Sequence, residues 1–316
     1  MAKKKLKIAL IFGGTSQERE VSLESAKSVL SNLDRKKYII DQIEVTKADW
    51  IVKSIKRLSA CDVALLALHG PGGEDGTVQG LLELLQIPYT GSNVLSSALA
   101  MNKQLTKKLV AMVGIPVLPD IVVNRKDYFK NQKNLLRKLK GKVVVKPNRL
   151  GSSIGISIAT GRPEINRAIE SALRHDEEVL VESFVSGREI TVPVLGNKDL
   201  RALPVIEIVP WKKSDFYDYS AKYAAGGSEH IIPAPLSKTE TKQVQELAMV
   251  AHKLLGCRGI TRSDFILDPK GRFWFLEINT IPGMTATSLA PQSAAKAGMS
   301  FPKFLDKLIE LALDKE

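Results

Sequence analysis

Two stretches in the first third of the chain have the largely apolar pattern of buried β-strands. They cover residues 6–12 and 62–68, and a glycine-rich segment follows each of them. After each glycine segment, apolar residues recur at helical spacing, over residues 21–33 and 78–85. Strands that are apolar on both faces are typical of parallel sheets covered by helices. The pattern therefore predicts an α/β unit with a parallel sheet at the start of the chain.

Two polar side chains stand where these strands end. Glu18 lies between the first strand and its helix, for which Ser22 is the expected N-cap, and His69 directly follows the second strand. Open α/β sheets bind ligands in the loops at the carboxyl ends of their parallel strands. Both residues are therefore candidates for ligand binding, although an isolated Glu18 is more often a solvated surface carboxylate.

The middle of the chain carries a strand, a Gly/Ser-rich loop and a second strand, over residues 143–147, 148–155 and 156–159. Glycines let a backbone approach phosphate closely, and successive N–H groups with Ser hydroxyls bind anions. The loop is not a P-loop, because no Gly-Lys-Ser/Thr sequence and no helix follow. A flexible hairpin loop is the alternative. Lys146, just before the loop, favours a phosphate.

Polarity patterns predict the elements of the remaining chain. They indicate a polar surface helix over residues 124–142, strands over 179–185, 190–195 and 203–209, and an amphipathic helix over 239–256. Residues 211–230 have no periodicity. Loops of this length are uncommon inside compact domains and often act as lids, so we expect a lid here.

The stretch 259–288 predicts two strands joined by the turn 268–271, in which Pro269 and Gly271 suit their turn positions. Because side chains alternate along a strand, Arg262 and Asp264 share one face of the first strand. Glu277 and Asn279 share one face of the second strand. The other face of the second strand is expected to hold Trp274, Leu276 and Ile278.

The pairing of the two strands decides which of these groups meet. If Leu267 pairs with Arg272, then Arg262 lies opposite Glu277. Asp264 then lies diagonal to Glu277, within reach of a long side chain. Carboxylate and amide oxygens are the ligands that Mg²⁺ takes together with phosphate oxygens and water. A polar hairpin face without a metal is the alternative.

Composition and charge narrow the function classes. The chain has 316 residues, a net charge of +12 and a pI of about 9.5, but its basic residues are dispersed and no RNA-type aromatic motif accompanies them. Anionic small substrates account for part of this charge. Two cysteines without metal spacing fit a reducing cytoplasm. Because the basic residues are dispersed, we do not expect a nucleic acid as a partner. No apolar run reaches membrane-spanning length, so we do not expect a membrane as a partner either.

Several motifs together resemble one family. They are GGTSQEREVS at 13–22, LHGPGGEDGTVQG at 68–80, PYTGS at 88–92, KPNRLGSSIG at 146–155, FYDYSAKY at 216–223, and the later TRSDF and EINTIPGMT. Their order over nearly the whole chain resembles the ATP-grasp superfamily, and within it the D-alanine–D-alanine ligase family.

The resemblance implies a three-domain ATP-grasp fold. An N-terminal α/β parallel-sheet domain would cover residues 1–101, a central α+β domain 102–186, and a C-terminal α+β domain with an antiparallel sheet 187–316. The implied activity joins two D-alanines through an acyl phosphate, giving D-alanyl-D-alanine, ADP and phosphate for peptidoglycan precursors. The implied cofactors are ATP as co-substrate and two Mg²⁺ ions, with Mn²⁺ as a substitute.

The resemblance also implies residue roles at the nucleotide. The implied ATP-binding residues are Lys103, Lys146, Ser152, Ser153, Glu182, Phe184, Val185, Glu189 and Lys222, with Glu182 at the adenine amino group and Glu189 at the ribose. The implied metal ligands are Asp264, Glu277 and Asn279. Departures from the family pattern occur at Leu150, Ser183 and Thr287 and bear on contacts with nucleotide and substrate.

Further roles are implied at the two D-alanines. The implied catalytic residues are Glu18, Ser152, Tyr223, Arg262 and Gly283. The implied substrate-binding residues are Glu18, His69, Tyr217, Arg262, Gly283, Ser288 and Leu289. Tyr223 favours an amine over a hydroxyl as the attacking group, because a site built around a hydrogen bond discriminates when that bond is lost.

Alternative functions remain open at this point. They are a related ligase with D-lactate or D-serine as second substrate and, from a different class, a non-catalytic nucleotide- or nucleic-acid-binding protein. The resemblance further implies a homodimer.

Overall fold

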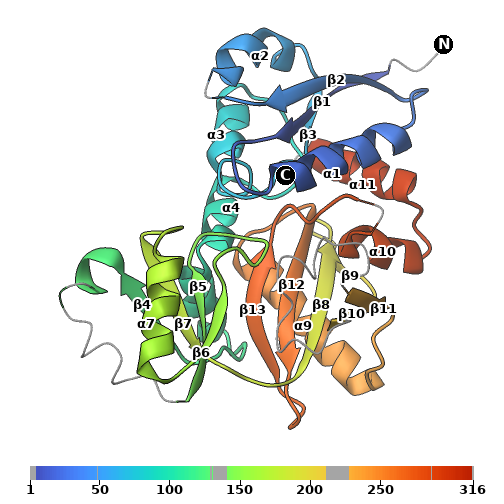
Figure 1. Ribbon diagram of the computed structural model, residues 1–316. Helices are drawn as coiled ribbons and strands as arrows, with labels where there is room; N and C mark the ends of the chain where they lie inside the picture. Colours follow the sequence, from blue (N-terminus) through green and yellow to red (C-terminus); the bar gives the residue numbers. More distant parts are fainter. Residues whose placement is uncertain are drawn as a thin grey trace.

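The computed structural model describes residues 5–47, 49–128, 130, 141–210, 228–285 and 287–314. These residues form three β-sheets, of which the N-terminal one is parallel and the other two are antiparallel (Figure 1). This confirms the predicted fold class, whereas the expected domain limits remain a prediction. No helix in the described ranges combines the length and apolarity needed to cross a bilayer.

The first sheet has the strand order β2-β1-β3 and helices on both faces. Its strands are β1 (Leu6–Gly13), β2 (Tyr38–Val45) and β3 (Val63–Leu66). Ile8 and Leu10 point to the face covered by α1 (Arg19–Asn32) and α11 (Phe301–Leu313). Ala9 and Ile11 point to the face covered by α2 (Trp50–Leu58) and α3 (Thr77–Leu84). The predicted two-faced burial is therefore confirmed.

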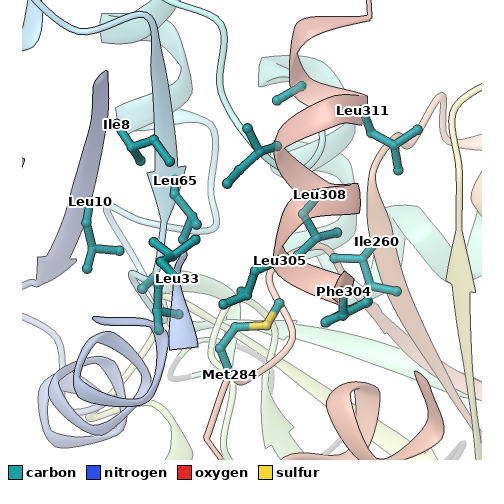
Figure 2. Close-up of a cluster of buried hydrophobic side chains, with 14 of the residues drawn as sticks. Ile8, Leu10, Leu33, Leu65, Ile260, Met284, Phe304, Leu305, Leu308 and Leu311 are labelled. Atoms are coloured by element: carbon teal, nitrogen blue, oxygen red, sulfur yellow. The ribbon is translucent and has the colours of Figure 1, made fainter. Parts of the chain in front are cut away.

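Helix α11, the last of the chain, packs on this first sheet. Its Leu305 and Leu308 belong to the same buried cluster as Ile8 and Leu65 of the sheet, and Figure 2 shows these side chains converging. Met284, from the loop after the last strand, joins the same cluster. The apolar core of the first sheet thus fixes a C-terminal loop beside the N-terminal strands.

Ser22 is not the N-cap of α1, so this prediction is wrong. The helix begins at Arg19, with Glu18 at its N-cap position. Ser22 is buried one turn inside, where its hydroxyl accepts from the Gly13 N–H at 2.7 Å and donates to the Ala67 carbonyl at 2.5 Å. Ser22 therefore joins the helix to the ends of both strands, and it leaves Glu18 at the mouth of the sheet.

The second sheet has the order β4-β7-β5-β6. Its strands are β4 (Asp120–Asn124), β7 (Glu178–Ser183), β5 (Lys142–Pro147) and β6 (Ser157–Thr160). Helix α7 (Gly161–Ala172) packs on one face. Helices α4 (Val94–Met101) and α5 (Lys103–Met112) lead into this sheet from the first. The surface helix expected over 124–142 falls largely outside the described residues.

The third sheet has the order β11-β10-β8-β12-β13, with β9 paired to β8. Its strands are β8 (Arg188–Leu195), β9 (Arg201–Ala202), β10 (Ile206–Pro210), β11 (Ser228–Ile231), β12 (Ile260–Leu267) and β13 (Phe273–Asn279). Helix α9 (Lys238–Leu254) packs against it, and α10 (Leu289–Lys296) follows β13. Of the expected lid, residues 211–227 lie outside the described residues.

The pairing of β12 with β13 differs from the prediction. Leu267 pairs with Phe273, because Arg272 closes the turn through hydrogen bonds with Asp268. The register then shifts again at Leu276, an extra residue in β13, so Asp264 lies directly opposite Glu277.

This β-bulge also corrects the predicted faces. Phe273, Phe275 and Ile278 are buried together in the core, whereas Leu276 lines the same cavity as Glu277. The prediction that Leu276 and Ile278 share a face is therefore wrong. The bulge turns two carboxylates toward one another, which a regular ladder would have offset.

Candidate active site

A cavity of about 390 Å³ lies between the second and third sheets. Cavities of this size accommodate small-molecule ligands. Its lining includes six of the residues implied for ATP: Lys146, Ser153, Glu182, Phe184, Val185 and Glu189. Lys222 falls outside the described residues. Lys103 and Ser152, which are also implied for ATP, do not line this cavity. We call it the nucleotide-side cavity.

A second cavity, of about 100 Å³, lies next to it. We call it the substrate-side cavity. Its lining includes Glu18, His69, Ser152, Arg262, Asn279, Gly283, Ser288 and Leu289. Tyr217 and Tyr223 fall outside the described residues. Residues next to the first sheet, in the glycine loop and on the C-terminal hairpin thus meet here, although they lie far apart in the sequence.

The two cavities share a wall. Asp264, Glu277, Glu189 and Ile208 line both of them. The carboxylates of Asp264 and Glu277 face each other across β12 and β13 because of the bulge. A group bound in one cavity can therefore meet a group bound in the other at these carboxylates.

Buried ion pairs organise the nucleotide-side cavity. Glu182 is almost completely buried, and its two oxygens lie 2.7 Å from Lys146 Nζ and 2.5 Å from Lys107 Nζ. Burial alone would raise the pKa of Glu182, but the two ammonium groups outweigh burial and hold this pKa below its ordinary value. Glu182 is therefore a carboxylate with two built-in cations.

Lys103 joins the hairpin to the glycine loop. It is the first residue of α5, after the N-cap Asn102, whose side chain accepts from the Leu105 N–H. Lys103 Nζ lies 3.2 Å from Glu277 Oε2 and donates to the Leu150 carbonyl at 2.6 Å. A buried ammonium thus pairs with Glu277 of the shared wall, although Lys103 itself lines neither cavity.

The oxygen ligands predicted for a metal are held by protein donors. Arg262 donates to both oxygens of Asp264, at 2.9 and 2.8 Å. Glu277 faces Lys103, and Asn279 Oδ1 accepts from the Ile281 N–H at 2.8 Å. Positive side chains therefore neutralise both carboxylates.

This donor set fits a hard divalent cation, because its atoms are carboxylate and amide oxygens on one hairpin. Within the described ranges, no three Asp, Glu, His or Cys side chains form a metal site by themselves. A cation here would need further oxygens, as Mg²⁺ does when it binds through one or two carboxylates and substrate phosphates.

The glycine loop reaches across to Glu18. Ser152 and Ser153 adopt left-handed backbone angles, with φ of 51° and 59°, which non-glycine residues seldom do. Ser152 donates a hydrogen bond to Glu18 Oε2. A Cβ on Gly151 would lie 2.9 Å from Glu18 Oε1, so only glycine lets the loop come this close.

Glu18 is a buried carboxylate with one oxygen that has no hydrogen-bond partner among the described residues. Burial raises the pKa of Glu18, and the nearby Glu74 carboxylate raises it further. His69 lies beside this pair, with Nε2 3.1 Å from Ser25 Oγ and Nδ1 3.7 Å from Glu74 Oε1. Such a carboxylate suits an incoming cation.

The C-terminal side of the same cavity offers hydroxyl and backbone groups. Ser288 Oγ accepts from the Thr285 N–H at 3.0 Å and lies 2.7 Å from Thr285 Oγ1. Leu289 begins α10, and Gly283 precedes Met284, whose N–H donates to Ser25. Arg262 of β12 also lines this cavity, with its guanidinium paired to Asp264.

Two family profiles match the parts of the chain that line both cavities. The profile described as D-ala D-ala ligase C-terminus matches residues 109–310, and the profile described as D-ala D-ala ligase N-terminus matches residues 7–59 and 52–92. The chain belongs to the D-alanine–D-alanine ligase family.

Individual relatives agree over the full length. A D-alanine–D-alanine ligase from Syntrophobacter fumaroxidans is 48% identical over 99% of this chain and 100% of its own. The D-alanine–D-alanine ligase from Bacillus anthracis complexed with ATP has a TM-score of 0.84 at 35% identity, covering 98% of each chain. The VanG D-Ala:D-Ser ligase from Enterococcus faecalis has a TM-score of 0.86 at 36% identity, covering 98% of this chain and 100% of its own.

The sequence analysis did not identify three residues in or next to the two cavities. Lys107 follows Lys103 by one helical turn, and this spacing could have shown that both lysines lie on the same face of α5. Glu74 lies in the recognised segment 68–80 but was given no role. His230 lines the substrate-side cavity, where Nδ1 lies 3.0 Å from Gln292 Oε1 and burial lowers its pKa. No local signal marks His230.

The departures from the family pattern have different weights. Leu150 contributes its backbone carbonyl to Lys103, a contact that any residue supplies. Ser183 closes β7, where it pairs with Val143. Thr287 lines the substrate-side cavity, 3.3 Å from Thr285 through their hydroxyl oxygens. Thr287 is therefore the departure best placed to affect substrate contacts.

Proposed function

We propose that this chain joins two D-alanine molecules into D-alanyl-D-alanine while converting ATP to ADP and phosphate. The observation that carries this proposal is the wall shared by the two cavities, which includes the carboxylates of Asp264 and Glu277. A reaction that moves a phosphoryl group from a nucleotide to a carboxylate requires two adjoining sites with charge neutralisation between them.

At the nucleotide end, the proposed work is binding and positioning. The adenosine part would lie between the two antiparallel sheets, near Phe184 and Val185, with Glu189 at the ribose. Lys146 and Lys103 would bind phosphate oxygens, under a cover formed by Ser152 and Ser153 of the glycine loop. Lys222 is proposed to add positive charge from the lid. Glu182 is proposed to lie at the adenine amino group.

Asp264, Glu277 and Asn279 would hold two Mg²⁺ ions, or Mn²⁺ in their place. When bound, these ions neutralise charge on the phosphates. Their binding would release Arg262 and Lys103 from the carboxylates with which they pair. Arg262 would then face the substrate-side cavity.

The first D-alanine would bind with its ammonium at Glu18 and its carboxylate toward the shared wall, near His69. An oxygen of that carboxylate attacks the γ-phosphorus, the bond to ADP breaks, and an acyl phosphate forms. Glu18 supports this placement because it is buried and has an oxygen with no hydrogen-bond partner in the described part of the chain. An ammonium supplies the missing charge and hydrogen bonds.

The second D-alanine would bind with its carboxylate at Ser288 and Leu289. Its amine, after losing a proton, attacks the acyl carbon, and phosphate leaves. The tetrahedral oxyanion needs fixed donors, and Arg262 and the Gly283 N–H are proposed for this role. Tyr217 and Tyr223 are proposed to contact the substrates from the lid, with Tyr223 linked to Ser152 and Glu18. We further propose a cytoplasmic homodimer, with no nucleic acid or membrane as partner.

The test is a turnover assay with purified protein, ATP, Mg²⁺ and D-alanine. We expect release of ADP, phosphate and the dipeptide in equal amounts, and no release without D-alanine. Absence of D-alanine-dependent phosphate release would overturn the proposal. Competition between D-alanine, D-serine and D-lactate near neutral pH tests the second substrate, because one structural relative is a D-Ala:D-Ser ligase. Preferential formation of a product with D-serine or D-lactate would overturn D-alanine as the second substrate and leave the rest of the proposal unchanged.

A further inference from the structure

Lys107 is a buried lysine that lies behind the nucleotide-side cavity and does not line it. Its side chain is 2% exposed. Its ammonium lies 2.5 Å from Glu182 Oε1, donates to the Leu118 carbonyl at 3.0 Å and pairs with Asp120. Lysine is rarely buried to this extent unless its charge is compensated, so this arrangement has a specific partner set.

The four charges of this cluster balance. Asp120 on β4 and Glu182 on β7 are opposite one another in the sheet. Both carboxylates pair with Lys107, which belongs to α5. Lys146 on β5 approaches Glu182 from the cavity side, at 2.7 Å. Glu182 therefore has one cation behind it and one cation in front of it, and only the front one lines the cavity.

The nucleotide and Glu182 compete for Lys146. A phosphate needs the Lys146 ammonium, but a buried carboxylate that lost its only cation would be left uncompensated, at a large cost. With Lys107 in place, Glu182 keeps a cation while Lys146 turns toward the phosphates. Without Lys107, Glu182 would hold Lys146 back.

We propose that Lys107 is a positioning residue of the nucleotide site, which holds Glu182 so that Lys146 is available to the phosphates of ATP. This inference rests on the proposed function, because it takes the nucleotide-side cavity to bind ATP. Lys107 itself touches neither nucleotide nor substrate. Its effect is on affinity for the phosphate part of the nucleotide, with little direct effect on the two D-alanines.

The first variant is Lys107→Met, with Lys108→Met as the matched control. Lys108 is the next residue of α5 and is exposed, so the control removes the same charge from the same helix. Calorimetric titration with Mg²⁺ and ADP should show about tenfold weaker binding in Lys107→Met and no change in Lys108→Met. In turnover assays the KM for ATP should rise about tenfold, while the KM for D-alanine stays within about twofold. Unchanged ADP affinity in Lys107→Met would overturn the proposal.

A double variant separates positioning from simple stability. Lys107→Met combined with Asp120→Asn removes one charge of each sign, so the buried cluster is neutral again and the melting temperature should recover toward that of the unmodified protein. Glu182 and Lys146 then form an exclusive pair, so ADP binding should stay about tenfold weaker. Recovery of both stability and ADP affinity would show a purely structural role and overturn the proposal.

Asp120→Asn alone should not weaken ADP binding, in contrast to Lys107→Met, and it keeps the test decisive if Lys107 variants do not fold. Asp120 is partly exposed, and without its charge Glu182 is the one remaining carboxylate of the cluster that pairs with Lys107. ADP affinity should then be equal to that of the unmodified protein or about threefold stronger, and weaker binding would contradict the proposal. Since ADP binding is measured without turnover, failure of the ligase assay with normal ADP titrations would count against the proposed function and not against Lys107.

Discussion

The nucleotide-side and substrate-side cavities share a wall but compensate their buried carboxylates differently. Glu182, in the first, lies between two lysines, and their charges hold its pKa below the ordinary value despite burial. Glu18, in the second, has a raised pKa and an oxygen without a hydrogen-bond partner in the described ranges. The chain therefore places cations where the proposed ligand is an anion, and an undercompensated anion where the proposed ligand is an ammonium.

Because of this difference, the two sites affect the stability of the folded protein differently. A buried polar group without a partner destabilises a fold by about 1–3 kcal/mol. The substrate-side cavity would carry such a cost until D-alanine binds, whereas the nucleotide-side cavity is compensated in advance. Variants that change one carboxylate at a time can separate these two situations.

The largest expected effect is at the shared wall, where both sites should fail together. Glu277→Ala removes one of the two facing carboxylates, and we expect kcat to fall on the order of 10³-fold, as loss of a preorganised charge at a transition state does. Glu246→Ala, at an exposed carboxylate of α9, is the control. Steady-state assays and circular dichroism measure activity and fold. Near-normal turnover in the Glu277 variant would remove the metal assignment.

A smaller effect should be confined to one cavity. Glu18→Gln keeps the shape of the side chain and the hydrogen bond from Ser152 but loses the charge. The KM for the first D-alanine should rise about 100-fold, because a buried charge pair with the ammonium is lost. Affinity for ADP should not change, and calorimetry measures it. An equal loss of ADP and D-alanine affinity would mean general damage and would contradict the separation of the two sites.

The raised pKa of Glu18 gives a pH signature for the same cavity. Protonated Glu18 cannot pair with an ammonium, so D-alanine affinity should fall as pH decreases through this raised pKa, above the pH range where ordinary glutamates titrate. Binding measured over a pH series should show this fall in the unmodified protein and a flat profile in Glu18→Gln. The same pH dependence in both proteins would assign it to another group.

A pair of glycine variants tests the closeness of the His69 loop to Glu18. Gly70 and Gly72 both have left-handed backbone angles, with φ of 74° and 84°, so alanine strains both. A Cβ at Gly70 would lie 2.9 Å from Glu18 Oε1, whereas a Cβ at Gly72 would meet nothing within 4 Å. Gly70→Ala should weaken D-alanine binding about tenfold and Gly72→Ala should not. Equal effects would show that strain alone acts.

The smallest expected effect is on the stability of the ligand-free protein. Because the pKa of Glu18 is higher in the folded than in the unfolded state, the folded state binds more protons between the two values, and stability falls as pH rises through this window. Glu18→Gln removes this loss, so its melting temperature should exceed that of the unmodified protein by about 2–4 °C at neutral pH. The difference should vanish at acidic pH, where Glu18 is protonated. A lower melting temperature in the variant would contradict the account.

The sequence predicted the fold class, because apolar runs of different period distinguish the parallel strands from the hairpin. Many of the residues implied for the site line the two cavities, but Lys103 lines neither and His230 was not foreseen. The roles of these residues stay a prediction. The sequence did not predict that Asp264 faces Glu277. That pairing depends on the turn including Arg272 and on the extra residue Leu276 in β13, and neither leaves a mark in the alternation of polar and apolar residues.

Buried charge was the second limit. Lys107 and Glu74 read as ordinary surface residues in the sequence, since Lys and Glu are mostly exposed. Their burial follows from neighbours that come together only in the fold, such as Asp120 and Glu182 around Lys107. The role of Ser22 was missed for the same reason. Its hydroxyl bonds to the backbone at the ends of two strands and does not cap its own helix.

The most direct test of phosphoryl transfer across the shared wall uses D-alanine labelled with ¹⁸O in its carboxylate. If a carboxylate oxygen attacks the γ-phosphorus and the acyl phosphate then breaks at carbon, one labelled oxygen passes to the released phosphate in every turnover. Mass spectrometry of the phosphate should therefore find a single ¹⁸O per molecule. Phosphate without label, formed in step with dipeptide, would contradict transfer between the two cavities.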